Sequence, residues 1–183
     1  MKLDLSFWTN ASARRKRIYT FLFIFIVSVL LTVIGSLVPI SHQAAVQTSN
    51  QLNQTLNKNR ATGTLPQYIF LNNFSICLLM FIPIVGPILG FFILFNTGYA
   101  LGAISQVQGI SPLLDVFLLM LTPVFWLEFT SYSIGITESI WLFRRLMQQR
   151  LGEFKNLAIL IGVCAGLLAV GAVVETWLIS LGI

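Results

Sequence analysis

The feature that most constrains this chain is a stretch without a single charged residue, which runs from Ala61 to Leu114. Soluble domains carry about a quarter of their residues as Asp, Glu, Lys or Arg, whereas this chain of 183 residues carries 9%. An apolar run longer than about 18 residues is typical of a membrane-spanning helix. The sequence therefore predicts an integral membrane protein with a single membrane domain over residues 1–183 and no separate soluble domain.

Apolar runs separated by polar or proline-containing segments predict an all-α, polytopic transmembrane helical bundle of about five spans. The fourth run is too long for one simple span, because about 31 residues of helix reach about 46 Å against a hydrocarbon core of about 30 Å. We therefore expect broken or re-entrant helices near Gly86-Pro87 and near Pro123, where proline removes a backbone donor. The predicted segments are an N-terminal segment (1–17), a first span (18–41), a polar loop (42–67), a second span (68–85), a third span (88–107), a fourth span with a break (113–143), a basic loop (144–156) and a fifth span (157–181).

Positive charge predicts the orientation of these segments. Lys and Arg are retained on the cytoplasmic side of membrane proteins. Nine of the eleven basic residues fall before the first span or in the basic loop: Lys2, Arg14, Arg15, Lys16, Arg17, Arg144, Arg145, Arg150 and Lys155. The sequence thus predicts a cell-membrane protein with a cytoplasmic N-terminus, an external polar loop and an external C-terminus. A re-entrant hairpin in place of spans two and three preserves the same orientation.

Three pairs of glycines are spaced four residues apart, which places each pair on one helical face and lets backbones approach closely. This spacing is typical of packing between helices of one chain, and it also occurs where chains associate. We keep both interpretations open. The pairs are Gly86 with Gly90, Gly98 with Gly102, and Gly162 with Gly166.

Three acidic residues, Asp115, Glu128 and Glu175, lie inside apolar runs that contain no Lys or Arg. Because a charged group at the bilayer centre costs about 2.5 to 3.5 kcal/mol, we expect these acids to be either protonated or hydrogen-bonded to amides and hydroxyls. Helical spacing predicts a polar seam, and these residues either tie helices together, line an ion or proton path, or form a partner-binding groove. The seam on one helix comprises Glu128, Ser131, Tyr132 and Gly135, and possible partners elsewhere are Asn72, Asn73, Asn96 and Thr97.

The residue inventory argues against an enzyme. The one histidine, His42, lies in the polar loop, which excludes a helical His-Glu-x-x-His metal site, and Ser133 has no evident base in the spans. We therefore predict no catalytic residue, no metal site and no cofactor. The net charge of +5 lies mostly beside the spans and does not predict nucleic-acid binding. The expected partners are the lipid bilayer and membrane proteins, either foreign chains or further copies of this one.

The order of several short motifs resembles the stage II sporulation protein M family, from about Phe70 to the C-terminus. The chain has Pro123-Val124-Phe125 where the family usually has Pro-His-Gly, and Thr97 intervenes in an Asn-Gly pair. The motifs are Phe70-Leu71-Asn72-Asn73, Gly86 with Gly90, Asn96-Thr97-Gly98 with Gly102, Pro123 with Glu128, and Ala172-Val173-Val174-Glu175. In sporulating bacteria the resembled protein anchors two cell-wall-degrading proteins in a membrane complex, so the resemblance implies a scaffold.

Our main hypothesis is a non-enzymatic multi-pass membrane scaffold, or assembly subunit, that holds partners through small-residue helix faces and the external loop. One alternative is a small-solute or ion transporter or channel that uses intramembrane carboxylates. Another is an accessory subunit of a larger membrane enzyme. The residues on which the site prediction depends are Asn72, Asn73, Asn96, Gly98, Gly102, Pro123, Glu128 and Glu175.

Overall fold

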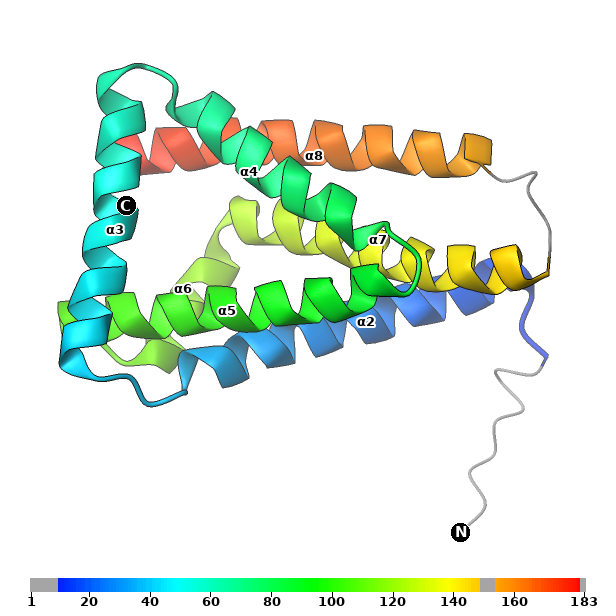
Figure 1. Cartoon of the computed structure of the whole chain (residues 1–183), viewed down its shortest axis with the longest axis horizontal. Helices are drawn as coiled ribbons and strands as arrows, with labels where there is room; N and C mark the ends of the chain where they lie inside the picture. The colour runs from blue at the N-terminus through cyan, green and yellow to red at the C-terminus, as the bar shows by residue number, and fades with distance from the viewer. Residues whose placement is uncertain (1–9, 149–153, 182–183) are drawn as a thin grey trace, which may run out of the picture.

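A computed structural model describes residues 10–148 and 154–181, and within these ranges every regular element is an α-helix. Four long helices, α2, α5, α7 and α8, run along the long axis of the molecule, and α3 crosses one end of it (Figure 1). The predicted all-α bundle is confirmed. The helices are α2 (Ala13–Ser36), α3 (His42–Ala61), α4 (Leu65–Met80), α5 (Val85–Gln108), α6 (Pro112–Leu121), α7 (Pro123–Met147) and α8 (Phe154–Leu181).

The predicted number of spans is approximate. Of the described helices, α2, α5 and α8 are each long and apolar enough to cross a membrane, and α6 and α7 together form a fourth candidate that bends by 89°. Helix α4 is apolar but shorter, with 16 residues. The five predicted spans therefore correspond to α2, α4, α5, the α6–α7 pair and α8.

The segment predicted as a polar loop contains a helix of 20 residues, α3. The Ser41 hydroxyl caps its first turn by accepting a hydrogen bond from the Ala44 backbone N–H at 3.3 Å. Ala45 and Ser49 lie on the same face and are buried, and α3 packs against α5. Most side chains of this segment are exposed, and the polar composition concealed a helix that packs through two small residues.

Small residues bring the backbones of α2 and α5 close together. A Cβ atom added at Gly98 would meet the Thr32 carbonyl group, and one added at Gly35 would meet the Phe95 carbonyl oxygen. The Thr32 hydroxyl also donates a hydrogen bond across the interface to the Leu94 carbonyl oxygen, at 3.2 Å. This arrangement is typical of membrane helices, in which small residues allow close packing and hydroxyls join neighbouring helices.

The break that we expected near Gly86-Pro87 lies just before that pair, at residues 81–84. Ile84 has a positive φ of 70°, and the Val85 N–H donates to the Pro83 carbonyl oxygen at 2.8 Å, so the chain reverses in a γ-turn. Pro87 is accommodated in the first turn of α5, where a backbone N–H has no helical partner. The α4–α5 turn lies short of the end of the bundle where α2 begins and α7 ends (Figure 1).

This apolar turn satisfies its polar backbone within the protein. The Ile82 carbonyl oxygen accepts hydrogen bonds from the Gly86 N–H at 2.7 Å and from the Ser139 hydroxyl at 2.5 Å. Backbone groups at membrane depth have no water to bind, so irregular backbone is tolerated there only when protein groups pair with it. The contact with α7 therefore satisfies the backbone of the turn at which the chain reverses between α4 and α5.

The predicted break near Pro123 is confirmed, since α6 ends at Leu121 and α7 begins at Pro123. Thr122 joins them: its hydroxyl donates to the Leu119 carbonyl oxygen at 2.7 Å and accepts from the Phe125 N–H at 3.3 Å. The Trp126 indole N–H donates to the Met120 carbonyl oxygen at 3.0 Å. Side chains thus supply the hydrogen bonds that the bend removes from the helix.

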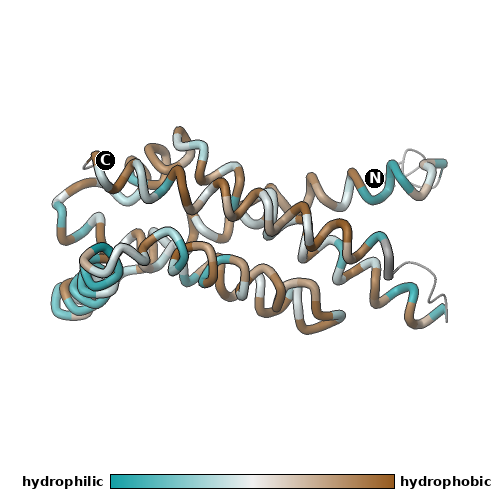
Figure 2. The backbone as a smooth tube through the Cα atoms, turned by 90° about the horizontal axis from the view of Figure 1, so that it is seen from above, coloured by the Kyte–Doolittle hydropathy of each residue, from teal (hydrophilic) through white to brown (hydrophobic). Residues whose placement is uncertain are grey.

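Hydrophilic residues concentrate on α3 and at the opposite end of the molecule, with hydrophobic residues between them (Figure 2). At that opposite end, the guanidinium groups of Arg17 and Arg144 lie over the Trp141 ring, 5.8 and 5.5 Å from its centroid. Arg17 and Arg144, one residue from each basic cluster, therefore lie at the same end of the bundle. Lys2 and Arg150, which belong to the same predicted clusters, lie outside the described residues.

Candidate functional site

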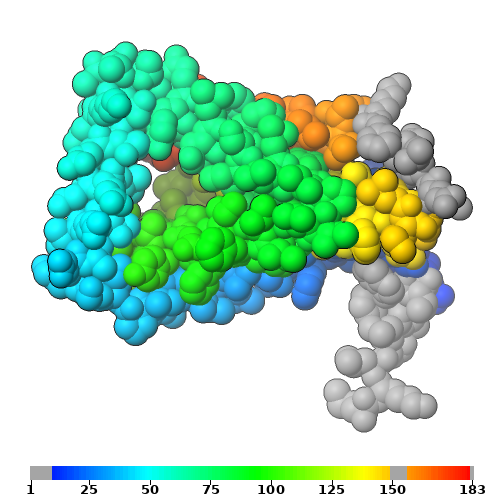
Figure 3. Space-filling model, in the orientation of Figure 1, coloured from blue at the N-terminus to red at the C-terminus, as the bar shows by residue number. Residues whose placement is uncertain are grey.

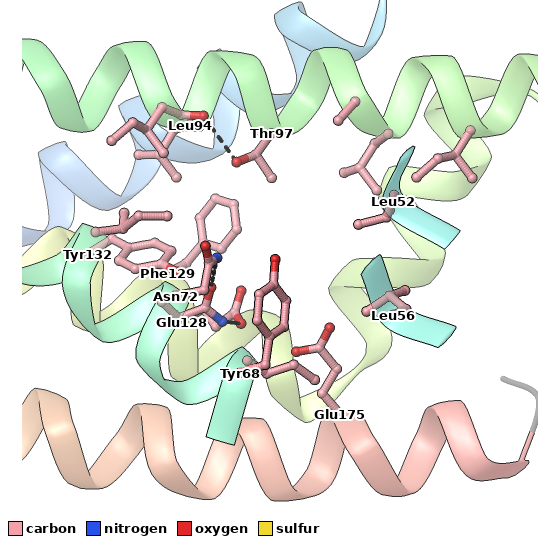
Figure 4. Close-up of a pocket in the computed structure, with 17 residues that line it drawn as sticks. Leu52, Leu56, Tyr68, Asn72, Leu94, Thr97, Glu128, Phe129, Tyr132 and Glu175 are labelled. Carbon is pink, nitrogen blue, oxygen red and sulfur yellow. Dashed lines mark hydrogen bonds between the residues drawn. The ribbon is translucent and has the colours of Figure 1, made fainter. Parts of the chain in front are cut away.

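A cavity of about 310 Å³ lies between five helices, α3, α4, α5, α7 and α8. The surface is hollowed between α3 and the α4–α5 pair, where the cavity opens (Figure 3). Figure 4 shows the side chains of Glu128, Tyr68 and Glu175 gathered on one side, with Thr97 and Leu94 opposite and the α3 leucines at one end. These leucines are Leu52 and Leu56.

Two carboxylates contribute the acidic groups of this cavity. The Asn73 side-chain amide donates a hydrogen bond to Glu128 Oε1, and the Asn72 amide donates in turn to Asn73 Oδ1 at 3.2 Å. Glu175 reaches the same cavity from α8. Among the described residues, Glu175 has no hydrogen-bond partner or ion-pair partner.

Three hydroxyls also line the cavity. Tyr132 is only 6% exposed, and its hydroxyl has no hydrogen-bond partner among the described residues. The Tyr68 hydroxyl points toward the middle of the cavity (Figure 4). Thr97 donates to the Ile93 carbonyl oxygen at 3.0 Å, which leaves its oxygen lone pairs free to accept. The polar lining is therefore rich in hydrogen-bond acceptors.

The structure brings half of the predicted site residues together and separates the rest. Asn72, Asn73, Glu128 and Glu175 share the cavity with Thr97. Asn96 instead lies on the exposed side of α5 and donates to the Phe92 carbonyl oxygen at 2.7 Å. The other predicted site residues lie elsewhere: Gly98 and Gly102 face α2, and Pro123 is the first residue of α7. The third intramembrane acid, Asp115, accepts a hydrogen bond from the Ser105 hydroxyl at 2.7 Å.

The polar seam predicted on one face of α7 divides between two surroundings. Glu128 and Tyr132 line the cavity. The Ser131 carbonyl oxygen instead accepts from the Cys77 thiol at 3.6 Å, and a Cβ atom at Gly135 would lie 3.3 Å from the Cys77 carbonyl oxygen. Each residue of a helix is rotated by about 100° from the one before, so these four side chains point in somewhat different directions. They therefore face more than one neighbouring helix.

Sequence reasoning missed a fourth acid in the apolar runs, Glu138, which is buried. The Glu138 side chain is 7% exposed and forms an ion pair with Arg17, at 3.8 Å between Oε2 and Nη2. Helix α2 begins at Ala13, so the basic block is helical and Arg17 faces the bundle. Glu138 precedes Arg144 by six residues, so it lies close to the predicted basic loop (144–156). This proximity to positive charge was the sequence signal for an ion pair.

The three glycine pairs have different surroundings. Positions 98 and 102 are filled by the Thr32 and Ser36 carbonyl groups of α2, and positions 86 and 90 by Met80, Ile136 and Ser139. These two pairs therefore serve packing within the chain and are not available to a partner. Gly162 and Gly166 are different, because no atom of another helix in the described part of the chain lies within 4 Å of a Cβ built at either position.

Within the described residues, no group of three or more His, Cys, Asp or Glu side chains lies close enough to hold a metal ion. The cavity combines two carboxylates, amides and hydroxyls with apolar walls. Such a lining offers a ligand hydrogen bonds, charge and apolar contact.

One comparison with known proteins identifies a family. The family model described as Stage II sporulation protein M matches residues 18–178, which includes the first predicted span as well as the region from Phe70 onward. No curated protein and no solved structure matches the chain. The matched family is not a known enzyme family. Because the match covers most of the chain, this membrane-type helical protein belongs to the Stage II sporulation protein M family.

Proposed function

We propose that this protein is a non-enzymatic scaffold that holds partner proteins in a membrane complex. The observation that supports this proposal most directly is the uncovered small-residue face of α8. Ala158, Gly162 and Gly166 are spaced by four residues and are exposed, with open space around both glycines. In lipid, such a face lets the backbone of another helix approach closely. The resulting van der Waals packing is a main source of attraction between membrane helices.

The apolar residues beside this face extend it along α8. Val170, Val173 and Trp177 are 55%, 63% and 60% exposed, and their spacing places them along the same side of the helix. The opposite side, with Cys164, Leu168 and Ala172, is buried in the bundle. The proposed occupant is a single transmembrane helix, either from a foreign chain or from a second copy of this one.

Replacing Gly162 or Gly166 with leucine should release that helix. The leucine side chain keeps the two backbones apart, and we expect the apparent affinity to fall by about tenfold or more, which corresponds to about 1.4 kcal/mol. The native complex would be extracted in mild detergent, its mass measured and each co-purifying chain identified. The wild-type mass should include a second chain in fixed stoichiometry, and the Gly162→Leu mass should lack it.

Alanine at the same positions is the matched control, because it keeps the small surface and should retain the partner. Both variants should fold and insert as the wild type does, since no other side chain lies within 4 Å of these sites. Unchanged stoichiometry in Gly162→Leu would exclude this face. If Gly162→Leu loses a second chain, the mass of that chain shows whether the wild-type complex is a hetero-complex or a homo-oligomer.

We propose further that the N-terminus is cytoplasmic and that α3 and the C-terminus are external. Arg17 and Arg144 meet at one end of the bundle and the polar α3 lies at the other. Basic residues are retained on the cytoplasmic side, which supports this orientation. Cysteine introduced as Gln54→Cys on α3 should react with a membrane-impermeant maleimide in intact cells. Gln148→Cys, at the end of α7, should react only after permeabilisation.

The two native cysteines make this test clean, because Cys77 and Cys164 are both fully buried and should give little background. Both introduced positions are exposed glutamines, so they are matched in side chain and accessibility. Labelling of Gln148→Cys in intact cells with protection of Gln54→Cys would reverse the proposed orientation.

A further inference from the structure

We propose that the cavity between α3, α4, α5, α7 and α8 binds a small amphiphilic amine, that is, a primary ammonium group on a short apolar chain. This site goes beyond the scaffold function and does not depend on it. Three properties of the cavity favour such a ligand: its charge, its hydrogen-bonding groups and its apolar walls.

The charge of the lining favours a cation. Glu128 and Glu175 both reach the cavity, and none of the described residues that line it is Lys or Arg. A carboxylate in a low-dielectric interior is costly unless a positive charge or hydrogen-bond donors compensate it. Asn73 supplies one donor to Glu128, whereas Glu175 has no partner in the described part of the chain. A bound cation would supply the missing counter-charge.

The hydrogen-bonding groups favour a ligand with several donors. The Asn73 amide and the Thr97 hydroxyl already donate within the protein, to Glu128 and to the Ile93 carbonyl oxygen. The unpartnered Tyr132 hydroxyl, the Tyr68 hydroxyl and the Glu175 carboxylate remain able to accept. An ammonium group carries three donors and no acceptor, so it complements this set.

The remaining walls favour an apolar chain beside the charge. Apolar side chains from α3, α4, α5 and α7 line the rest of the cavity, among them Leu52, Leu56, Ile76, Leu101 and Phe129. The volume of about 310 Å³ lies at the lower end of ligand-pocket volumes, which begin near 300 Å³. This is more space than a bare ion fills and less than a lipid with two acyl chains requires. An aminophospholipid would also place its phosphate next to the carboxylates, where like charges repel.

The test uses n-hexylammonium as the probe and the neutral n-hexanol as its matched control. The full chain in mild detergent would be titrated with each compound while the thermal unfolding midpoint is recorded. A ligand that binds the folded state raises this midpoint in a saturable way. We expect saturable stabilisation by hexylammonium and none by hexanol at the same concentration.

Three substitutions assign the effect to the cavity. Glu175→Gln removes a negative charge while keeping the shape of the side chain, and it should weaken hexylammonium binding at least tenfold. Glu128→Gln should weaken binding by a similar factor, and its amide oxygen still accepts the hydrogen bond from Asn73. Asp115→Asn is the matched control, because Asp115 is a carboxylate outside the cavity that accepts from Ser105, and its binding should equal that of the wild type. Isothermal titration would measure each dissociation constant.

The proposal is overturned if hexanol stabilises the chain as much as hexylammonium, because the site then recognises only the apolar chain. It is also overturned if the wild type shows no saturable response, or if both glutamine variants bind as the wild type does. Should one glutamine variant fail to fold, the other glutamine variant and Tyr132→Phe test the same site. Tyr132→Phe removes a hydrogen-bond acceptor and should also weaken hexylammonium binding. Gly162→Leu should bind hexylammonium normally, so failure of the scaffold proposal and failure of this one are distinguishable.

Discussion

Replacing Gly98 with alanine should destabilise the protein by about 3 kcal/mol, the upper part of the range for overpacking. The added methyl group would meet the Thr32 carbonyl group, with its carbon at 2.8 Å, and the Ser36 backbone nitrogen at 3.0 Å. These are backbone atoms, so no rotamer change can relieve the contact. Helix α2 would have to move away from α5, which also breaks the hydrogen bond from Thr32 to the Leu94 carbonyl oxygen.

The measurement is denaturant or thermal unfolding of the purified chain in one detergent, with Gly162→Ala as the control. That residue is also a helical glycine, but it has open space around it, and alanine there should be neutral or stabilising by up to about 1 kcal/mol through helix propensity. Equal stabilities for the two variants would contradict the close α2–α5 contact. Gly35→Ala should repeat the Gly98 result, because it meets the Phe95 carbonyl oxygen from the other side of the same interface.

Replacing Asn73 with leucine should have the second-largest effect, a loss of about 1.5 to 3 kcal/mol, which is the usual value of a hydrogen bond to a charged group. Leucine has the same branched skeleton of side-chain heavy atoms but leaves Glu128 without its donor. The loss should depend on the carboxylate. In a Glu128→Leu background, the same Asn73 substitution should cost much less, because no acceptor is left unsatisfied.

A double-mutant cycle over these four proteins gives the coupling energy directly. We expect about 1 to 2 kcal/mol, somewhat above the average for membrane hydrogen bonds because the acceptor is a carboxyl group. A coupling near zero would mean that Asn73 contributes only its volume. Asn96→Leu serves as the control for removing an amide from a membrane helix, since Asn96 bonds only the Phe92 carbonyl oxygen of its own helix.

Elements whose boundaries depend on local chemistry were well predicted from the sequence. The last span was expected at residues 157–181 and the helix runs over Phe154–Leu181. The break near Pro123 was expected because proline removes a donor, and the helix is interrupted at Thr122. The first break was placed too late, because proline near a helix start is tolerated and the γ-turn at Ile84 involves a β-branched residue that carries no turn signal.

The candidate site was predictable in its acids but not in its assembly. Polar residues in apolar runs pointed to Asn72, Asn73, Glu128 and Glu175, and these share one cavity. The separation of Asn96 from them could not be predicted, because it depends on which face of α5 turns toward the bundle. The pairing of Glu138 with Arg17 was equally hidden, since it required α2 to lie beside α7. Such neighbour relations arise from tertiary packing and leave little trace in a single sequence.

The short α4 and α6 have a consequence for the surrounding lipid. With 16 and 10 residues, these helices rise about 24 and 15 Å, against a hydrocarbon core of about 30 Å, whereas α2 and α8 are longer than that core. The sides of the protein are thus unequal in height. A bilayer that meets such a body thins locally on its shorter flank, at a cost that grows with membrane thickness. Bilayer thickness thereby becomes a determinant of where this protein accumulates and of which neighbours gather beside it.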